Sequence, residues 1–170
     1  LSASITYAKG FLHNGIHAVD LARFLFGECR DGVYLADRAD ADPADPSAAA
    51  FLTFDRAPQV FLKPLDERYY THFEVDIFTD RARYVINNDH RMLTRWSRRE
   101  GVGIPPGLRL VAQAPETTDY DHAMLSLMDN ASAVLKGTEA PICTGREALA
   151  AQDIIERLKH DKKIVNGATR

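Results

Sequence analysis

The chain has 170 residues, of which 45% are hydrophobic and 26% are charged, which is sufficient for one globular domain with a core. A formal net charge of -3 and the lack of a bilayer-length apolar run argue against nucleic acid or a membrane as partner. Cys29 and Cys143 are too few for a secreted disulfide scaffold, so we expect free, partly buried thiols in a cytoplasmic protein.

The first predicted elements are a short strand and a buried helix. Residues 4–9 alternate weakly between polar and apolar side chains, which favours a strand, and Gly10 ends it. Residues 15–26 form the predicted helix, with Asn14 as its N-cap and Gly27 as its C-terminal stop. Apolar side chains occupy nearly all of its circumference, so we expect this helix to be buried.

A loop and a run of strands follow. Residues 37–47 are rich in Asp, Ala and Pro, a composition typical of loops. Short apolar or alternating segments predict strands at 49–54, 59–62, 73–77, 83–87, 91–96 and 108–112. Residues 90–99 are basic with one aromatic, and we assign them to a solvated face of the sheet.

Two amphipathic helices are predicted after the strands. The apolar face of the first consists of Met124, Leu127, Met128, Ala131, Val134 and Leu135, and Gly137 stops the helix. The second begins with the capping-box spacing of Thr144 and Glu147, and its inner stripe is Ala148, Ala151, Ile155 and Leu158. Consecutive strands without intervening helices predict an α+β fold: an open, mainly antiparallel or mixed β-sheet covered on one face by helices.

Residues 7–20 contain the densest set of chemically useful side chains. His17 lies in the first turn of the predicted helix, where the helix dipole disfavours a protonated imidazole. A neutral histidine there can exchange a proton with a ligand, and the alternative is a core or capping histidine satisfied by a hydrogen bond. Asp20 is placed either to orient His17 or to pair with Arg23.

The same residues allow a metal-binding interpretation. His13, His17 and Asp20 have i, i+4 and i+7 spacing, which would put them near one helical face in a metal-dependent hydrolase. His13 precedes the expected cap and no further ligand is evident, so we rank this hypothesis below the acid/base role of His17 and expect no metal.

Residues 7–28 follow the pattern Y-x-K-G-x-x-x-N-G-x-H-x-x-D-L-x-R-x-L-F-G-E. This pattern resembles a recurrent segment of the Gfo/Idh/MocA oxidoreductases. The hairpin at 73–87 is similar to the central sheet of that family, and residues 120–159 are similar to its closing pair of helices. Members of the family have a Rossmann domain that binds NAD(P), followed by a C-terminal domain that supplies the open sheet and much of the substrate pocket.

The resemblance implies that residues 1–170 are the substrate-binding and oligomerisation domain alone. A dinucleotide-binding turn of the form G-x-G-x-x-G is missing, because the glycines of 101–107 stand beside prolines where a helix should start. The family's Glu-Lys-Pro motif, with its catalytic lysine, is also missing. We therefore expect NAD or NADP to bind the full-length protein and no cofactor to bind this chain alone.

The resemblance also implies roles for individual side chains. His17 would be the acid/base, Lys9, Asn14 and His13 would contact the substrate, and Asp20 would act through His17. His13 stands where many relatives carry an Asp. The Asn-Gly-x-His pattern is typical of a branch that acts on nucleotide sugars or other polyol-like alcohols, and a homodimer through the sheet face is expected. The alternative is a non-catalytic ligand-binding or assembly module on the same scaffold.

Overall fold

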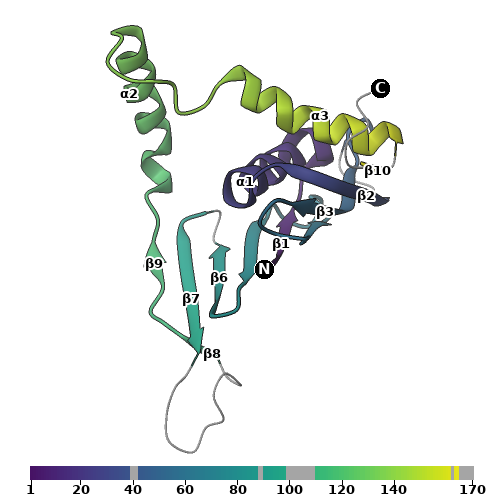
Figure 1. The fold of residues 1–170 in the computed structure, drawn as a ribbon. Coiled ribbons are helices and arrows are strands. Elements are labelled where there is room, and N and C mark those ends of the chain that lie inside the picture. The colour runs from purple at the N-terminus through teal and green to yellow at the C-terminus, as the bar shows by residue number, and fades with distance from the viewer. Residues whose placement is uncertain (39–41, 88–89, 99–109, 162, 165–170) are drawn as a thin grey trace, which may run out of the picture.

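The computed structural model describes residues 1–38, 42–87, 90–98, 110–161 and 163–164. Within them, ten strands form one open sheet in the spatial order β10-β2-β3-β4-β1-β5-β6-β7-β8, and β9 pairs with β7 (Figure 1). The strands are β1 (Ser2–Tyr7), β2 (Cys29–Arg38), β3 (Ser47–Phe54), β4 (Gln59–Pro64), β5 (Phe73–Phe78), β6 (Ala82–Asn87), β7 (Met92–Arg98), β8 (Leu110–Ala112), β9 (Glu116–Thr117) and β10 (Lys163–Ile164). The helical segments are a π-helical turn η1 (Gly10–Gly15), α1 (Ile16–Phe26), a 3₁₀ turn η2 (Tyr120–His122), α2 (Ala123–Leu135) and α3 (Gly145–Asp161).

β1 lies near the middle of the sheet and gives it its mixed character. It pairs in parallel with β4 and antiparallel with β5, and the other described strand pairs are antiparallel. The parallel pair forms because the chain passes through α1, β2 and β3 before it returns as β4. Ala3, Ile5 and Tyr7 alternate onto one face and are buried, as expected for a strand with one face in the core.

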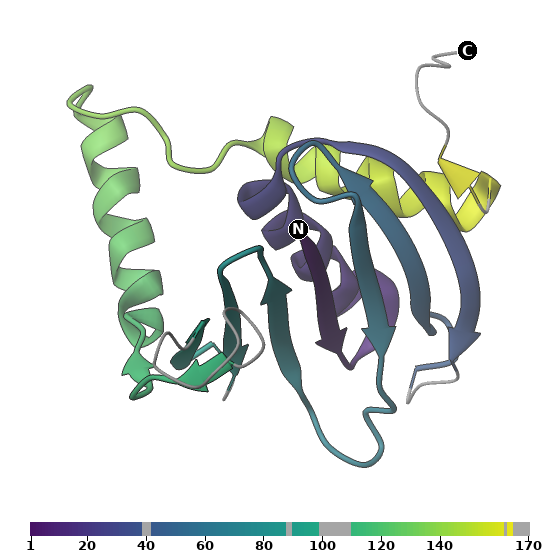
Figure 2. The ribbon, with the colours of Figure 1, turned by 60° about the horizontal axis from the view of Figure 1, so that its bottom comes forward.

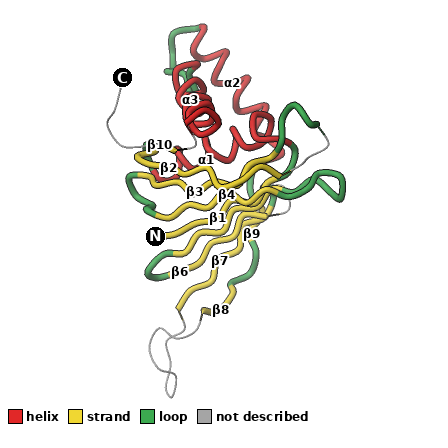
Figure 3. Tube along the Cα trace, turned by 90° about the vertical axis from the view of Figure 1, so that its right-hand side faces the viewer, coloured by secondary structure: helices red, strands yellow, loops and turns green. Residues whose placement is uncertain are grey.

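Helices α1 and α3 lie on the same face of the sheet (Figure 3). The buried side chains that they add to the core are Ala18, Val19, Ala22 and Phe26 from α1, and Ala151, Ile154, Ile155 and Leu158 from α3. These residues pack with Ile5, Leu52 and Leu62 of the sheet. The predicted fold class, α+β with an open mixed sheet covered on one face, is therefore confirmed.

The expectation that the first helix is buried all round is wrong in part. Phe24 is 81% exposed, and Leu21 and Leu25 are only partly buried, because α1 contacts the sheet on one side and α3 on another. Ala148 of the predicted inner stripe of α3 is exposed, and Ile154 takes a buried position instead. Helix existence follows from the apolar pattern, whereas the extent of burial depends on what covers each side.

Helix α2 stands apart from the sheet and from α1 (Figures 1 and 2). Its predicted apolar face is largely exposed: Met124 is 66%, Met128 64% and Leu135 89% exposed. The apolar face predicted for this helix is therefore not part of the core formed by the described residues. No helix in the described part of the chain has the length and apolarity needed to cross a membrane.

Strand β2 was not predicted from the sequence. Two irregularities in its pairing with β3, between Cys29 and Asp31 and between Tyr34 and Ala36, interrupt the two-residue alternation that identifies a strand. β2 also extends to Arg38, and β3 begins at Ser47, so the expected loop at 37–47 is shorter than predicted. The Gly/Pro loop expected at 101–107, and the start of the strand expected at 108–112, lie outside the described residues.

Candidate functional site

A tight π-helical turn, η1, connects β1 to α1 and shapes the candidate site. It starts with two consecutive residues at positive φ, Lys9 at 76° and Gly10 at 75°. A side chain at position 10 would place its Cβ 2.1 Å from Oδ2 of Asp45, so only glycine fits. The Asp45 carboxylate accepts hydrogen bonds from the backbone N–H groups of Leu12 and His13, at 2.9–3.1 Å.

The predicted capping role of Asn14 is wrong. Because η1 continues directly into α1, the residue before the helix is Gly15, and the helix start has no side-chain cap. The Asn14 Nδ2 group instead donates a hydrogen bond to the carbonyl of Ala8 at 2.8 Å, which ties the turn back to the end of β1. This bond fixes the orientation of the Asn14 amide beside the next turn of helix.

Residue His17 lies in the first turn of α1 with an exposed side chain. Among the described residues, its imidazole makes no hydrogen bond or ion pair. It lines a cavity of about 450 Å³, here called the His17 hollow, whose other lining residues are Asn14, Thr71, Phe73, His90 and Tyr120. The imidazole is therefore neither a capping group nor a core group.

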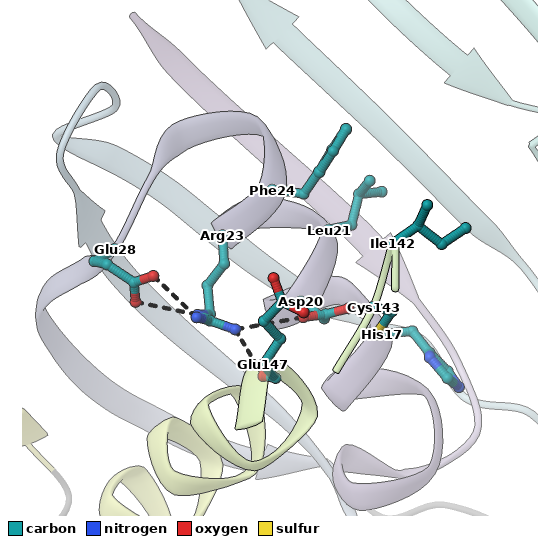
Figure 4. Close-up of a pocket in the computed structure, with 9 residues that line it drawn as sticks. All are labelled: His17, Asp20, Leu21, Arg23, Phe24, Glu28, Ile142, Cys143 and Glu147. Atoms are coloured by element: carbon teal, nitrogen blue, oxygen red, sulfur yellow. Dashed lines mark hydrogen bonds and ion pairs between the residues drawn. The ribbon is translucent and has the colours of Figure 1, made fainter. Parts of the chain in front are cut away.

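His17 also lines a second cavity, the Arg23 hollow, which has a volume of about 350 Å³ (Figure 4). Its lining residues are His17, Asp20, Leu21, Arg23, Phe24, Glu28, Ile142, Cys143 and Glu147. Figure 4 shows His17 pointing away from the polar cluster around Arg23. His17 thus lines two cavities: one is built around an ion pair, and the other has no Asp, Glu, Lys or Arg among its described lining residues.

The ion pair in the Arg23 hollow is structural. The Arg23 guanidinium donates to both carboxylate oxygens of Glu28, at 3.2 and 2.9 Å, and to the carbonyl of Glu147 at 2.8 Å. Asp20 approaches the same guanidinium at 3.5 Å and does not bond to His17. Of the two roles open to Asp20 from the sequence, the structure shows the ion pair. Arg23 therefore ties the end of α1 to the start of α3.

The remaining predicted site residues lie in a third cavity. Lys9 and His13 line a hollow of about 350 Å³ together with Gly10, Asp42, Asp45 and Glu67. Among the described residues, His13 and His17 thus line different cavities. No group of three or more His, Cys, Asp or Glu side chains in the described residues is arranged to hold a metal ion. The metal-binding interpretation of His13, His17 and Asp20 has no support in this geometry.

Two other residues of the 7–28 pattern, Tyr7 and Gly15, contribute to the packing of the core. The Tyr7 hydroxyl is buried, donates to the carbonyl of Ala48 at 2.7 Å and accepts from the Ala48 N–H at 2.8 Å. A Cβ at Gly15 would lie 2.4 Å from Cδ2 of Phe11, so the ring packs against the bare backbone. The pattern therefore combines residues that hold η1 in place with residues that line the His17 hollow.

Both cysteines are free, and they differ in environment. Cys29 is partly buried, and desolvation by burial raises its pKa to about 12, so the thiol stays protonated at neutral pH. Cys143 is exposed at the rim of the Arg23 hollow, contrary to the expected partial burial. The structure gives Cys29 the properties of an inert packing residue.

Four lining residues of the His17 hollow were not identified from the sequence: Thr71, Phe73, His90 and Tyr120. Thr71 lies just before β5, Phe73 begins β5, His90 lies in the β6–β7 turn and Tyr120 begins η2, so no local spacing connects them to His17. His90 was assigned to a solvated face, which is wrong, because the ring is partly buried between Phe73 and Tyr120. His90 has a positive φ of 71°, but this is a property of the folded backbone and cannot be seen in the sequence.

Comparisons with known proteins find solved structures of the same fold. No family model and no curated protein matches the chain. A solved UDP-N-acetylglucosamine 3-dehydrogenase from Acidithiobacillus ferrooxidans superposes with a TM-score of 0.67 at 17% identity, covering 92% of this chain and 52% of that one. An oxidoreductase from Agrobacterium radiobacter in complex with NAD⁺, L-tartaric acid and magnesium gives 0.64 at 13%, covering 97% and 56%. A levoglucosan dehydrogenase in complex with NADH gives 0.67 at 12%, covering 98% and 58%.

The chain spans about half the length of each of these structures. The chain shares its α+β fold with about half of each of these oxidoreductase and dehydrogenase structures. The resemblance found in residues 7–28 is thus confirmed at the level of the fold.

Proposed function

We propose that this chain is the substrate-binding half of an oxidoreductase that transfers a hydride between NAD(P) and a sugar-like or polyol alcohol. The observation that carries the proposal is the position of His17: its exposed imidazole has no partner among the described residues and lines a cavity of about 450 Å³ together with Asn14. Cavities of roughly 300–1,000 Å³ are typical of small-molecule sites.

The lining of the His17 hollow favours an uncharged ligand rich in hydroxyl groups. Apart from its two imidazoles, none of the described residues that line it carries an ionisable acid or base that is charged at neutral pH. Amide, hydroxyl, phenol and imidazole groups donate and accept hydrogen bonds, and they match alcohols better than phosphates or carboxylates. A sugar or cyclic polyol has this chemistry.

In the proposed reaction, His17 takes the proton from the substrate hydroxyl and returns it in the reverse direction. Asn14 holds the same end of the substrate, because its bond to Ala8 leaves the amide oxygen for a ligand. When bound, the nicotinamide supplies hydride chemistry. The described residues have no glycine-rich turn between a strand and a helix for its pyrophosphate, so we assign cofactor binding to a separate domain that precedes residues 1–170.

Exposed apolar side chains support the existence of such a partner domain. Helix α2 exposes Met124, Leu125, Met128 and Leu135, and Phe24 of α1 is 81% exposed. Several large apolar side chains exposed on one helix favour an interface there in the complete protein. We propose that the nucleotide-binding domain covers it, and that residues 1–170 form one domain of the complete protein.

Lys9 and His13 are assigned to a distal part of the substrate, since they line a separate hollow across η1.

We also propose a homodimer through the uncovered face of the sheet in a cytoplasmic protein. Strand register places Val33 opposite Phe51 on that face, and Phe78 lies on it as well; they are 39%, 39% and 45% exposed. Sedimentation of Phe51→Glu against the parent protein tests the dimer, which the substitution should dissociate.

The function is tested on the gene product that contains residues 1–170 with its preceding domain. We expect NAD(P)-dependent oxidation of a cyclic polyol, and His17→Ala should lower kcat by about 100-fold. His160→Ala is the matched control, because His160 is exposed at the end of α3 and pairs only with Glu156. An unchanged kcat in His17→Ala would reduce His17 to a structural residue.

The isolated chain provides the second measurement. NADH should bind it weakly or not at all, and tight binding would contradict the assignment of the cofactor to another domain. A non-catalytic ligand-binding module is the alternative function, and it is favoured by the fact that six described residues of this chain line the His17 hollow. Polyol binding by a gene product that never transfers a hydride would establish that alternative.

A further inference from the structure

Two of the described residues that line the His17 hollow carry a hydroxyl group, Thr71 and Tyr120. Thr71 lies in the loop ahead of β5 with an exposed side chain. Tyr120 begins η2, and its ring is packed on neighbouring side chains. A hydroxyl on an anchored ring binds a ligand at a smaller entropic cost than one on a free side chain, so Tyr120 is the stronger candidate for a ligand contact.

The Tyr120 ring is held by two neighbours. It stacks on the His90 ring, with 4.9 Å between the ring centroids and 29° between the ring planes. The Arg91 guanidinium lies over the Tyr120 ring, 5.3 Å from its centroid, in a cation–π contact. Both contacts are made to the ring and neither uses the hydroxyl, so they restrict the orientation of the ring and leave its polar end for another partner.

The backbone around Tyr120 is fixed to the same turn between β6 and β7. The hydroxyl of Thr118 donates to the carbonyl of His90, and the N–H of Thr118 donates to the carbonyl of Arg91 at 2.9 Å. The Arg91 side chain pairs with Asp121 at 3.0 Å. Residues on both sides of Tyr120 are therefore bonded to the turn, which holds the position of the ring as well as its orientation.

The Tyr120 hydroxyl makes no hydrogen bond with the described part of the chain, and the residue is 45% exposed. A phenol hydroxyl can both donate and accept, so it can pair with an alcohol in either sense. The described lining of the hollow contains no Asp, Glu, Lys or Arg that would favour a charged ligand instead. Tyr120 thus has the chemistry that an uncharged, hydroxyl-rich ligand requires.

We propose that Tyr120 is a substrate-binding residue, whose hydroxyl forms a hydrogen bond with a hydroxyl group of a polyol in the His17 hollow. The inference rests on the proposed function for its substrate class and adds a contact from η2 to those from the start of α1. In this arrangement His17 exchanges the proton of the reacting alcohol, and Tyr120 holds a hydroxyl that does not react.

The test is an equilibrium binding measurement on the gene product that contains residues 1–170 with its preceding domain. The probe is myo-inositol, and the readout is isothermal titration calorimetry. Tyr120→Phe removes the hydroxyl and retains the ring that stacks on His90. Because one hydrogen bond between uncharged groups is lost, the Kd should rise about fivefold.

Tyr69→Phe is the matched control. It removes the same hydroxyl from a tyrosine that is 77% exposed and is not among the residues lining the His17 hollow, so its Kd should equal that of the parent protein. Circular dichroism of both variants checks that the fold is retained.

Steady-state kinetics with the polyol as substrate separate binding from chemistry. A residue that binds the substrate without exchanging its proton should raise KM about fivefold in Tyr120→Phe at an unchanged kcat. His17→Ala, in contrast, should lower kcat.

An unchanged Kd in a folded Tyr120→Phe variant would overturn the inference, as would an equal loss of affinity in Tyr69→Phe, or no binding of myo-inositol by the parent protein. The inference and the proposed function fail separately. Tyr120-dependent binding by a gene product that transfers no hydride would remove the oxidoreductase and retain the Tyr120 contact. Hydride transfer from a polyol with the same KM in Tyr120→Phe and the parent protein would do the reverse.

Discussion

Helices α3 and α2 have the same kind of sequence pattern and opposite surroundings. Both carry an apolar stripe at helical spacing. In α3 that stripe is buried against α1 and the sheet, with Ile155 and Leu158 fully covered. In α2 the stripe is open, and Leu135 is 89% exposed. The pattern predicts that a helix has a face to cover, but it does not specify which part of the protein covers it.

The polar contacts of the two helices differ in the same way. The start of α3 is connected to the end of α1, 124 residues away in sequence, through Arg23 and the carbonyl of Glu147. The polar side chain buried in α2, Asn130, bonds to the segment that follows: to Glu139, to the carbonyl of Ala140 and to the N–H of Ile142, each at 3.0 Å. Helix α2 thus forms a unit with its own loop, whereas α3 is part of the core.

The largest expected effect is a difference in how much substitutions in α3 and in α2 lower the free energy of unfolding. Ile155→Ala removes a fully buried side chain from α3 and should lower the free energy of unfolding by about 2–5 kcal/mol. Met128→Ala on α2, where the side chain is 64% exposed, should change it by less than about 0.5 kcal/mol. Urea denaturation followed by circular dichroism measures both. Equal losses would mean that α2 packs against the body of the chain in solution.

The next effect concerns the connection between α1 and α3. Arg23→Met removes two hydrogen bonds to Glu28 and one to the Glu147 carbonyl, from a side chain that is 10% exposed. We expect a loss of about 1.5–3 kcal/mol in the free energy of unfolding, since charged groups form the stronger hydrogen bonds.

Arg157→Met is the control for this substitution. Its pair with Asp153 lies on the exposed surface of α3 at 3.3 Å, so its loss should cost less than about 0.5 kcal/mol. Similar urea midpoints for the two arginine variants would show that the long-range contact adds nothing beyond a surface ion pair.

A smaller effect is expected at the cap of α3. Thr144→Ala removes the hydroxyl that receives the Glu147 N–H at 3.3 Å and donates to the Glu147 carboxylate at 2.9 Å, and it should cost about 1 kcal/mol. Thr138→Ala, just beyond α2, removes one exposed bond to the carbonyl of Ala133 and should cost less. A larger loss for Thr138→Ala in urea denaturation would reverse the ranking of the two helices.

These contrasts also show which features the sequence was able to predict. Gly27 and Gly137 were assigned as helix stops, and both have positive φ, 88° and 72°, because this requirement is local. The Thr144–Glu147 capping box forms for the same reason. Asn14 has the composition of a cap, but the π-helical turn moves the helix start past it, and nothing in its immediate spacing signals that turn.

The candidate site was predictable only on its α1 side. His17 and Asn14 were identified because they sit in one short motif. His90 and Tyr120 join them through the pairing of β5, β6 and β7 and the return of the chain into η2, which are long-range events. Asp45 is a similar case: it caps η1 from a segment that was predicted only as a loop. A sequence pattern cannot carry the identity of partners that tertiary structure brings together.

The smallest effect is a pH dependence confined to the start of α3. Hydrogen bonds from the Thr144 N–H and then from its hydroxyl hold the pKa of the Glu147 carboxyl below its usual value. A carboxyl whose pKa is lower in the folded state stabilises that state above its ordinary pKa of about 4.3, and the contribution is lost as the pH falls through its folded-state pKa. Glu147→Gln should therefore destabilise the chain at pH 7 and converge with the parent chain at low pH.

Helix α2 provides the internal contrast for that measurement, because its start has no side-chain cap. NMR carbonyl and Cα shifts of the first turn of α3 should move toward coil values as the pH falls below about 4, whereas those at the start of α2 should not follow the Glu147 titration. If the first turns of both helices lose structure together over this range, acidification acts on the whole chain. The difference between the two helices would then lie in their packing alone, and the capping box would contribute nothing separable to the order of α3.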